Sequence, residues 1–342
     1  MQKIGSITID DTYYPGRDLY SDGEIEDEML DIAKNVPVSE YNRVIAERKS
    51  WAILYHFSNV RENIVQSMPI TKEDRVLEIG AGCGAITGVL ARMAKSVDAV
   101  ELSMKRSMIN AYRHQEADNV TIKVGNFQEV EQHLEKKYDV ITLIGVFEYA
   151  CSYINSEQPY AEFLEIIKKH LAPNGRLILA IENKFGLKYW AGCREDHIAT
   201  FFGGIEGYAK DSYVRTFSKN ELAHMLEQAG FSERIFYYPY PDYKLPEKIF
   251  SDEYLPHENE LNVNHRNFDR NRVRLFDENK VYGEFKGKPA QVVRKVLSMF
   301  DIPAGESWKQ PETLTYWQQG IRPYTRSLRK PMVRKQMACI LK

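Results

Sequence analysis

Residues 74–103 read DRVLEIGAGCGAITGVLARMAKSVDAVELS. A short apolar strand runs into three glycines at alternate positions, and a helix with one apolar face follows them. Where glycines join a strand to a helix, the missing side chains let a ligand approach the backbone and the positive end of the helix. Acids flank the loop, with Glu78 two positions before the first glycine and Glu101 at the end of the next strand. The stretch therefore predicts a strand, loop, helix and strand that bind a small ligand.

The alternation of strands and helices continues beyond this stretch. The strand at 138–145 is apolar throughout, as strands buried on both faces are. Ser218 and Glu221 have the spacing of a capping box, which predicts a helix at 217–231. This pattern predicts an α/β fold with a doubly wound, mostly parallel, Rossmann-like sheet and helices on both faces. The strands are expected at residues 75–80, 96–102, 120–126, 138–145, 176–182 and 232–241, and the connecting helices at 85–95, 104–117, 127–137 and 160–173.

The chain divides into three segments. Residues 1–69 are an acidic N-terminal segment and a helical cap, irregular over the first 35 residues and with one or two helices over 39–68. Residues 70–285 form the ligand-binding domain. Residues 286–342 carry 12 Lys and Arg against 3 Asp and Glu, a net charge of +9, and are expected to form a basic, loosely attached extension. Because a proline and helical spacing disfavour a strand there, the sheet is expected to end imperfectly or with a short strand near 272–276.

Composition narrows the class of protein. The 342 residues are 43% hydrophobic and 27% charged with a formal net charge of -2, which gives no global attraction to nucleic acid or to an anionic membrane. No apolar run approaches the roughly 18 residues of a membrane span, and the first residues lack a secretory pattern. Four scattered cysteines favour reduced thiols over disulfides or a zinc site. We expect a cytoplasmic chain with no metal, no nucleic-acid partner and no membrane span.

The glycine loop alone fits two kinds of cofactor. Gly80, Gly82 and Ala85 also satisfy the dinucleotide pattern, and an acid such as Glu101 accepts hydrogen bonds from ribose hydroxyls in either case. Glu78 separates the two possibilities. A carboxylate at that position would repel a pyrophosphate but would suit a ligand that carries an ammonium and a sulfonium. The residues therefore favour a cationic nucleoside over a dinucleotide.

Several motifs resemble, in order and spacing, those of class I S-adenosylmethionine-dependent methyltransferases. VLEIGAGCG (76–84) with Glu101 resembles motif I and the acidic position after it, VGNF (124–127) resembles the adenine-contact motif with an amide where an Asp is common, and LIGVFEYA (143–150) resembles the fourth-strand motif. The resemblance covers about residues 70–240. It implies a seven-stranded sheet whose last strand is antiparallel, with S-adenosylmethionine (AdoMet) over the ends of the first two strands. The residues that it assigns to the cofactor are Tyr55, Arg61, Glu78, Gly80, Ala81, Gly82, Glu101, Leu102, Asn126, Phe127 and Gly145.

The acceptor site is expected near the fourth strand and under residues 184–215, a long, aromatic and glycine-rich segment that suits a roof over a pocket. If the acceptor is a hydroxyl, a base must remove its proton, and Glu148 and His197 are the candidate catalytic residues. A strand-capping acid and a structural histidine are the alternative interpretations. YHFSNVRENIV (55–65) and ENKFGLKYWAGCREDH (182–197) resemble methyltransferase modules of bacterial surface-polysaccharide and glycosyltransferase systems, which suggests a hydroxyl of a glycan or other small molecule.

Two other functions stay open from the sequence. A nucleotide-cofactor oxidoreductase or epimerase of the NAD type would use the same glycine loop. A non-catalytic AdoMet-binding module would keep the cofactor residues without an acceptor site. The basic extension, residues 286–342, is the expected contact for a partner or a second subunit.

Overall fold

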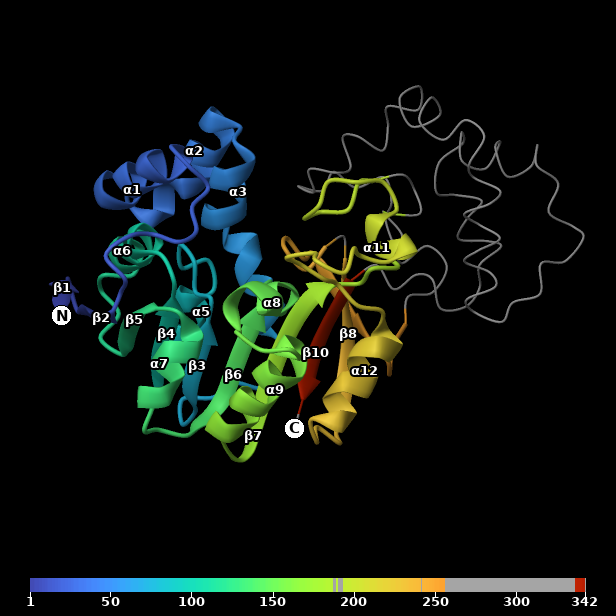
Figure 1. Cartoon of the computed structure of the whole chain (residues 1–342). Helices are drawn as coiled ribbons and strands as arrows, with labels where there is room; N and C mark the ends of the chain where they lie inside the picture. Colours follow the sequence, from blue (N-terminus) through green and yellow to red (C-terminus); the bar gives the residue numbers. More distant parts are fainter. Residues whose placement is uncertain (187–188, 190–192, 241, 256–335, 342) are drawn as a thin grey trace, which may run out of the picture.

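The computed structural model describes residues 1–186, 189, 193–240, 242–255 and 336–341, which form a single sheet flanked by helices (Figure 1). Ten strands of the described chain pair in the order β1-β2-β5-β4-β3-β6-β7-β10-β8-β9. The predicted α/β fold with a mostly parallel, doubly wound sheet is confirmed. The strands are β1 (Gln2–Ile4), β2 (Ile7–Tyr13), β3 (Arg75–Ile79), β4 (Ser96–Glu101), β5 (Val120–Gly125), β6 (Tyr138–Ile144), β7 (Leu171–Glu182), β8 (Arg234–Tyr240), β9 (Lys248–Ser251) and β10 (Gln336–Leu341).

The five central strands place their carboxyl ends at one edge of the sheet. β3 lies in the middle, and the chain crosses to β4 and β5 on one side of it before it returns to β6 and β7 on the other. The loops that leave β3 and β6 therefore diverge from each other. Open α/β sheets bind ligands in the crevice that forms at such a point.

Helices cover both faces of the sheet, so the central strands are apolar on both sides. α7, α9 and α12 pack on one face through side chains such as Phe163 and Leu222, and they lie in front of the strands in Figure 1. α4, α5 and α6 cover the other face through side chains such as Val65 and Leu90. The helices are α1 (Ile25–Asn35), α2 (Tyr41–Arg48), α3 (Trp51–Phe57), α4 (Asn63–Gln66), α5 (Thr87–Met93), α6 (Met104–Arg113), α7 (Phe127–Val130), α8 (Ala150–Tyr153), α9 (Pro159–His170), α11 (Gly203–Glu206) and α12 (Lys219–Gln228), with 3-10 turns η1 (Val38–Glu40), η2 (Asn59–Glu62), η3 (Glu131–His133) and η4 (Phe147–Tyr149).

The N-terminal residues are more ordered than the sequence predicted, and the first of them join the sheet. β2 joins the sheet parallel to β5, with Ile9 opposite Ile122, and α1 occupies part of the stretch expected to be irregular. The helix or helix pair expected over 39–68 is divided into short pieces. Lys49 has a left-handed φ of 51° after α2, which ends that helix before α3 begins. The boundary predicted at residue 69 therefore does not delimit the sheet.

The C-terminal strand departs from the expectation for the last residues of the basic extension, of which the structure describes residues 336–341. β10 runs antiparallel between β7 and β8, with Ala338 opposite both Ala180 and Tyr237. Residues 336–341 are thus part of the sheet and not a loosely attached appendage, because the facing edges of β7 and β8 both find their hydrogen-bond partners in this strand. The strand expected near 272–276 lies outside the described residues.

The predicted limits of three helices compare with the structure as follows: one start is confirmed and two helices are shorter than predicted. The capping box of Ser218 and Glu221 is present at the start of α12. The helix expected over 127–137 is confined to α7 and a 3-10 turn, and α9 ends at His170, before the expected Pro173. In the described part of the chain, no helix has both the length and the apolar character that a bilayer crossing needs.

Candidate cofactor and acceptor site

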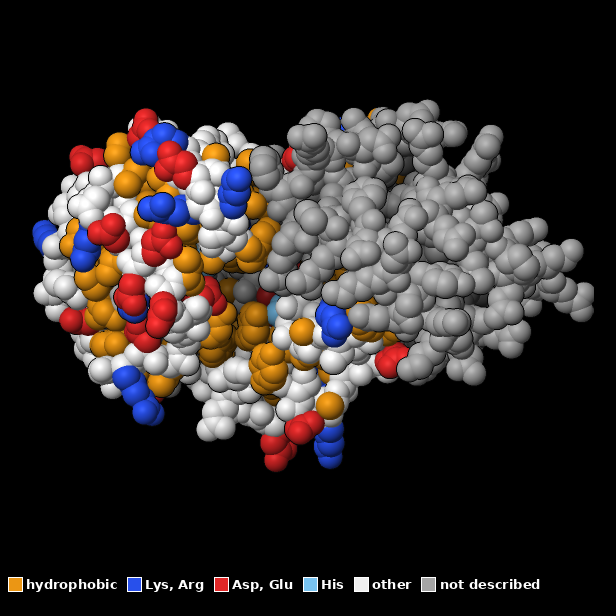
Figure 2. Space-filling view, turned by 90° about the horizontal axis from the view of Figure 1, so that it is seen from above, with side chains coloured by type: hydrophobic (Ala, Val, Ile, Leu, Met, Phe, Trp, Pro, Cys, Tyr) orange, Lys and Arg blue, Asp and Glu red, His pale blue; other side chains and the backbone are white. Residues whose placement is uncertain are grey.

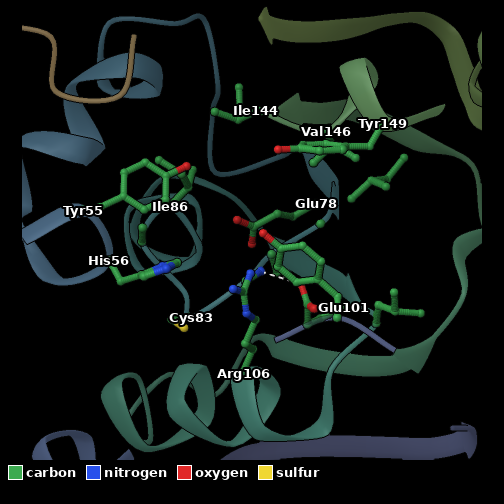
Figure 3. A pocket seen from close by; sticks show the side chains of 18 of the residues that line it. Tyr55, His56, Glu78, Cys83, Ile86, Glu101, Arg106, Ile144, Val146 and Tyr149 are labelled. Carbon is green, nitrogen blue, oxygen red and sulfur yellow. Dashed lines mark hydrogen bonds between the residues drawn. The ribbon is translucent and has the colours of Figure 1, made fainter. Parts of the chain in front are cut away.

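A cavity of about 500 Å³ opens at the carboxyl ends of β3, β4, β5 and β6. Every residue singled out from the sequence, whether for the cofactor or for catalysis, lines it. Figure 3 shows Glu78, Glu101 and Arg106 pointing into a common space, with Tyr55 and His56 on one side and Tyr149 on another. Residues from distant parts of the sequence therefore meet in one pocket.

The glycine loop between β3 and α5 opens onto this cavity. Gly80, Gly82 and Gly84 have φ angles of +71°, +54° and +76°, in the left-handed region that other residues rarely adopt. A Cβ on Gly80 would collide with Val146, and one on Gly84 would collide with Asn110, so these glycines allow the loop to pack closely. A Cβ on Gly82 would meet no atom of the described residues within 4 Å. The space at Gly82 is therefore free for a ligand.

Glu101, at the end of β4, is fixed by the backbone of the loops around it. Its Oε2 accepts the N–H of Gly82 at 2.7 Å, and its Oε1 accepts the N–H of Ser103 at 2.9 Å. Each oxygen of an ionised carboxylate has a second lone pair, so Glu101 can still accept two hydroxyl donors. Burial raises the pKa of this carboxyl above its ordinary value. The geometry fits the diol of a ribose.

Glu78, inside the end of β3, is a buried acid without a counter-charge. Its Oε2 accepts the hydroxyl of Thr87 at 2.7 Å, and no Lys or Arg of the described residues lies within ion-pair distance. Burial raises the pKa of Glu78 to about 8, with a further upward contribution from Glu101. Glu78 is therefore not a strand-end acid that is paired with a base of the described residues. A cationic ligand group would supply the missing charge.

Arg61 and Tyr55 form a wall of the cavity. The guanidinium lies 4.3 Å from the centre of the Tyr55 ring and donates to the backbone oxygen of Lys244 at 3.0 Å. Arg61 is buried, so it is not a solvated helix residue, and its Nε has no hydrogen-bond partner among the described residues. A buried guanidinium with a donor to spare suits an anionic group such as a carboxylate.

The remaining predicted cofactor residues follow the ends of β4, β5 and β6 or belong to the glycine loop. Asn126 caps α7, and its Oδ1 accepts a backbone N–H two residues on at 2.9 Å, so its Nδ2 is the group left to face a ligand. Phe127 is buried behind it, and Gly145 has a positive φ of 70°. Leu102 and Ala81 complete this part of the lining. The site thus offers the side-chain amide of Asn126 next to an apolar surface, and an adenine ring can use both, the first for hydrogen bonds and the second for its faces.

Glu148 and His197 meet in the wall of the same cavity, together with two acids that the sequence did not single out. The Nε2 of His197 lies 3.8 Å from Glu148 and 3.8 Å from Glu182, and its Nδ1 lies 2.8 Å from Glu195. Burial alone would lower the pKa of His197, but these three carboxylates raise it well above its ordinary value. Burial raises the pKa of Glu148. The cluster therefore favours a positive charge at this point.

Other lining residues were missed because they come from segments outside the strand ends. Tyr20 and Asp22 reach the cavity from the N-terminal segment, which Arg106 holds by donating to Asp22 at 2.6 Å and to Glu26 at 2.7 Å. Lys244 arrives from the segment after β8. For Tyr20 and Asp22, the acidic run SDGEIEDE (21–28) was the only signal in the sequence that this segment contacts a basic residue such as Arg106.

Comparison with known proteins finds a methyltransferase family model and relatives that are named methyltransferases. A family model for the methyltransferase domain matches residues 53–233. Ribosomal RNA small subunit methyltransferase A of Borreliella afzelii is 31% identical over 98 residues, which are 28% of this chain and 35% of that protein. Demethylspheroidene O-methyltransferase of Rhodobacter capsulatus is 25% identical over 213 residues, 62% of this chain and 50% of that protein. The structure of phosphoethanolamine N-methyltransferase 1 of Haemonchus contortus aligns with a TM-score of 0.40 at 18% identity, over 66% of this chain and 48% of that one.

The family match covers more than half of the chain, so the chain belongs to the methyltransferase domain family. Its sheet, in which the antiparallel β10 lies between β7 and β8, is that of the class I enzymes. Its cofactor is AdoMet. The alignment takes in about a third of the length of the first curated relatives that the chain matches.

Proposed function

We propose that this chain transfers the methyl group of AdoMet to a hydroxyl of a glycan or other small molecule in the cytoplasm. The observation that supports this proposal is that one cavity collects all the residues predicted for cofactor and acceptor. Its volume of about 500 Å³ is within the range of small-molecule sites. The proposal uses the cavity in two parts, one for the cofactor and one for the acceptor.

In the cofactor part, each side chain has a chemical counterpart in AdoMet. Bound AdoMet supplies an electrophilic methyl group on a positively charged sulfur. We assign the ribose hydroxyls to Glu101, the ammonium to Glu78 and the carboxylate to Arg61. Gly82 leaves the space in which the cofactor would contact the loop. The buried carboxyl of Glu78, which pairs with no Lys or Arg of the described residues, and the spare donor of Arg61 support these assignments.

In the acceptor part, the chain must orient a hydroxyl and receive its proton. Methyl transfer is an in-line displacement, so positioning supplies much of the catalysis. The oxygen–carbon bond forms as the sulfur–carbon bond breaks, and the hydroxyl proton passes to a base. Glu148 and His197 are the proposed catalytic residues, because the fourth-strand motif and residues 193–215 bring them together at the cavity wall. The pKa of His197 is raised well above its ordinary value, so Glu148 is the member of the pair that is better placed to receive the proton.

The acceptor class rests on the resemblance to polysaccharide-associated modules and on surface charge. Two relatives act on different acceptors by name, one on ribosomal RNA and one as an O-methyltransferase. Nucleic-acid binding needs a continuous basic surface. On the face of the molecule shown in Figure 2, acidic and basic side chains of the described residues are interspersed, so the described part of this face does not present such a surface.

A transfer assay with labelled AdoMet tests the proposal. The full chain is incubated separately with a glycan fraction, a small-molecule fraction and total RNA from cells, and the labelled product is identified by mass spectrometry. We expect an O-methylated product in one of the first two fractions, and none with the Glu101→Ala variant. Label in RNA alone would refute the acceptor class. Failure of the wild-type chain to bind AdoMet in calorimetry would refute the function itself.

A further inference from the structure

Three side chains from separate elements converge in the wall of the cavity. Glu148 belongs to η4, Glu182 is the last residue of β7, and His197 follows in the segment after β7. One donor atom from each lies within 4.8 Å of the other two. Glu148 is 1% exposed, Glu182 is 0% exposed and the His197 side chain is 6% exposed. Two carboxylates and an imidazole are thus enclosed together.

The contacts within this group are incomplete. The distances of 3.8 Å from His197 Nε2 to Glu148 Oε1 and to Glu182 Oε2 exceed the length of a hydrogen bond. Glu148 Oε2 and Glu182 Oε2 are buried, and neither has a hydrogen-bond partner among the described residues. Leaving a buried carboxylate oxygen unpaired is unfavourable. Lys244 pairs with Oε1 of Glu182 only, so these two Oε2 atoms remain open to a positively charged ligand.

The orientation of the imidazole fits the same conclusion. Glu195 Oε1 lies 2.8 Å from His197 Nδ1, and a carboxylate can only accept, so the ring proton is placed on Nδ1. Glu195 is itself fixed by the backbone N–H groups of His197 and Ile198, both at 2.7 Å, and by the hydroxyl of Tyr208 at 2.9 Å. Nε2 then faces Glu148 and Glu182, and the proton that these carboxylates favour on Nε2 is released when an ion takes its place. A carboxylate that orients a histidine in this way is the usual outer contact of a metal-binding histidine.

We propose that Glu148, Glu182 and His197 bind a divalent transition-metal ion, with Glu195 as the residue that positions His197. Carboxylates suit Mn²⁺, and imidazole suits Fe²⁺ and Zn²⁺, so the ion belongs to this group. Donors bound at about 2.1 Å to one ion lie at most about 4.2 Å apart, so side-chain shifts of under about 1 Å would close the site. Lys244 bonds to Oε1 of Glu182 and leaves Oε2 for the ion.

This inference deepens the proposed function and rests on it only for the chemical use of the ion. An ion next to the acceptor would lower the pKa of a coordinated hydroxyl. With Nε2 of His197 bound to the ion, Glu148 Oε2 remains to take the proton. The binding of the ion itself does not depend on the identity of the acceptor.

The test is metal binding by the full chain after treatment with a chelator. Mn²⁺ alone is titrated and followed by electron paramagnetic resonance, Zn²⁺ alone is titrated by calorimetry, and AdoMet affinity is measured for every variant as a check of the fold. We expect one ion per chain, loss of binding in His197→Gln and Glu182→Gln, and binding weaker by about 10- to 100-fold in Glu195→Gln. His224→Gln, an exposed histidine on α12, should bind the ion as the wild type does.

The outcomes separate this inference from the proposed function. Absence of stoichiometric Mn²⁺ or Zn²⁺ binding in a chain that binds AdoMet would overturn the metal site and leave the proposed function standing. Binding that persists in both His197→Gln and Glu182→Gln would also overturn it, because the ion would then bind at other residues. An ion that binds at these residues in a chain without AdoMet affinity would support the site and refute the function.

Discussion

AdoMet binding should release a proton from Glu78. The pKa of about 8 means that ionising this buried carboxyl costs about 5 kcal/mol more than in water. At pH 7 it is about 90% protonated, whereas a bound ammonium favours the ionised form. We therefore expect the wild-type chain to release about 0.9 proton more than Glu78→Gln when it binds AdoMet at pH 7.

Calorimetry in two buffers of different ionisation enthalpy measures this difference directly. Because the folded pKa is raised, the carboxylate becomes available only as the pH rises through about 8. The ratio of the wild-type affinity for AdoMet to that of Glu78→Gln should therefore increase roughly 15-fold between pH 6.5 and pH 8, as the ionised fraction of Glu78 does. Glu73→Gln, at an exposed position outside the cavity, should match the wild type in both measurements. Equal proton release by the wild type and Glu78→Gln would show that Glu78 does not meet the cationic part of the cofactor.

Three further changes test other parts of the structure. Glu101→Ala should weaken AdoMet binding by about 2–3 kcal/mol in calorimetry, because two charge-assisted hydrogen bonds are lost; unchanged affinity would remove Glu101 from the ribose. Gly82→Val should abolish AdoMet binding with nearly unchanged circular dichroism, whereas Gly23→Ala, with a φ of +85° and open space outside the cavity, should leave binding intact. Truncation after residue 335 should lower the melting temperature sharply or cause aggregation by removing β10, and a stable truncated chain would show that the sheet does not need this strand.

The parts of the fold that local sequence patterns specify were predicted well. β3, α5 and β4 follow one another within 27 residues, and each has its own periodicity and breakers. β2 and β10 were missed because their partners are remote: β2 pairs with β5, more than a hundred residues later, and β10 pairs with β7 and β8. A short strand beside an acidic or basic run carries little signal of its own, and only the tertiary pairing stabilises it.

In the candidate site, too, local sequence patterns indicated some residues, whereas others depend on contacts between distant parts of the chain. Glu78, Glu101 and the glycine loop could be assigned because the spacing between them follows from the strand and helix lengths. Glu182 and Glu195 could not, since their role depends on how residues 193–215 fold back against η4 and β7. Glu195 lies two positions before His197, and an acid at that spacing in a loop is the one local pattern that could have indicated it.

The place of β10 also affects how the protein is made in the cell. Residues 241–335 separate β8 from β10 in sequence, so a ribosome must synthesise all of them before the gap between β7 and β8 can be filled. Until then the nascent chain presents two strand edges with unpaired backbone groups, and such edges are sites of mispairing between chains. Closing the sheet also requires a contact between distant residues, which makes the step slow compared with local folding. We therefore expect the yield of folded protein to depend on chaperones that bind during translation.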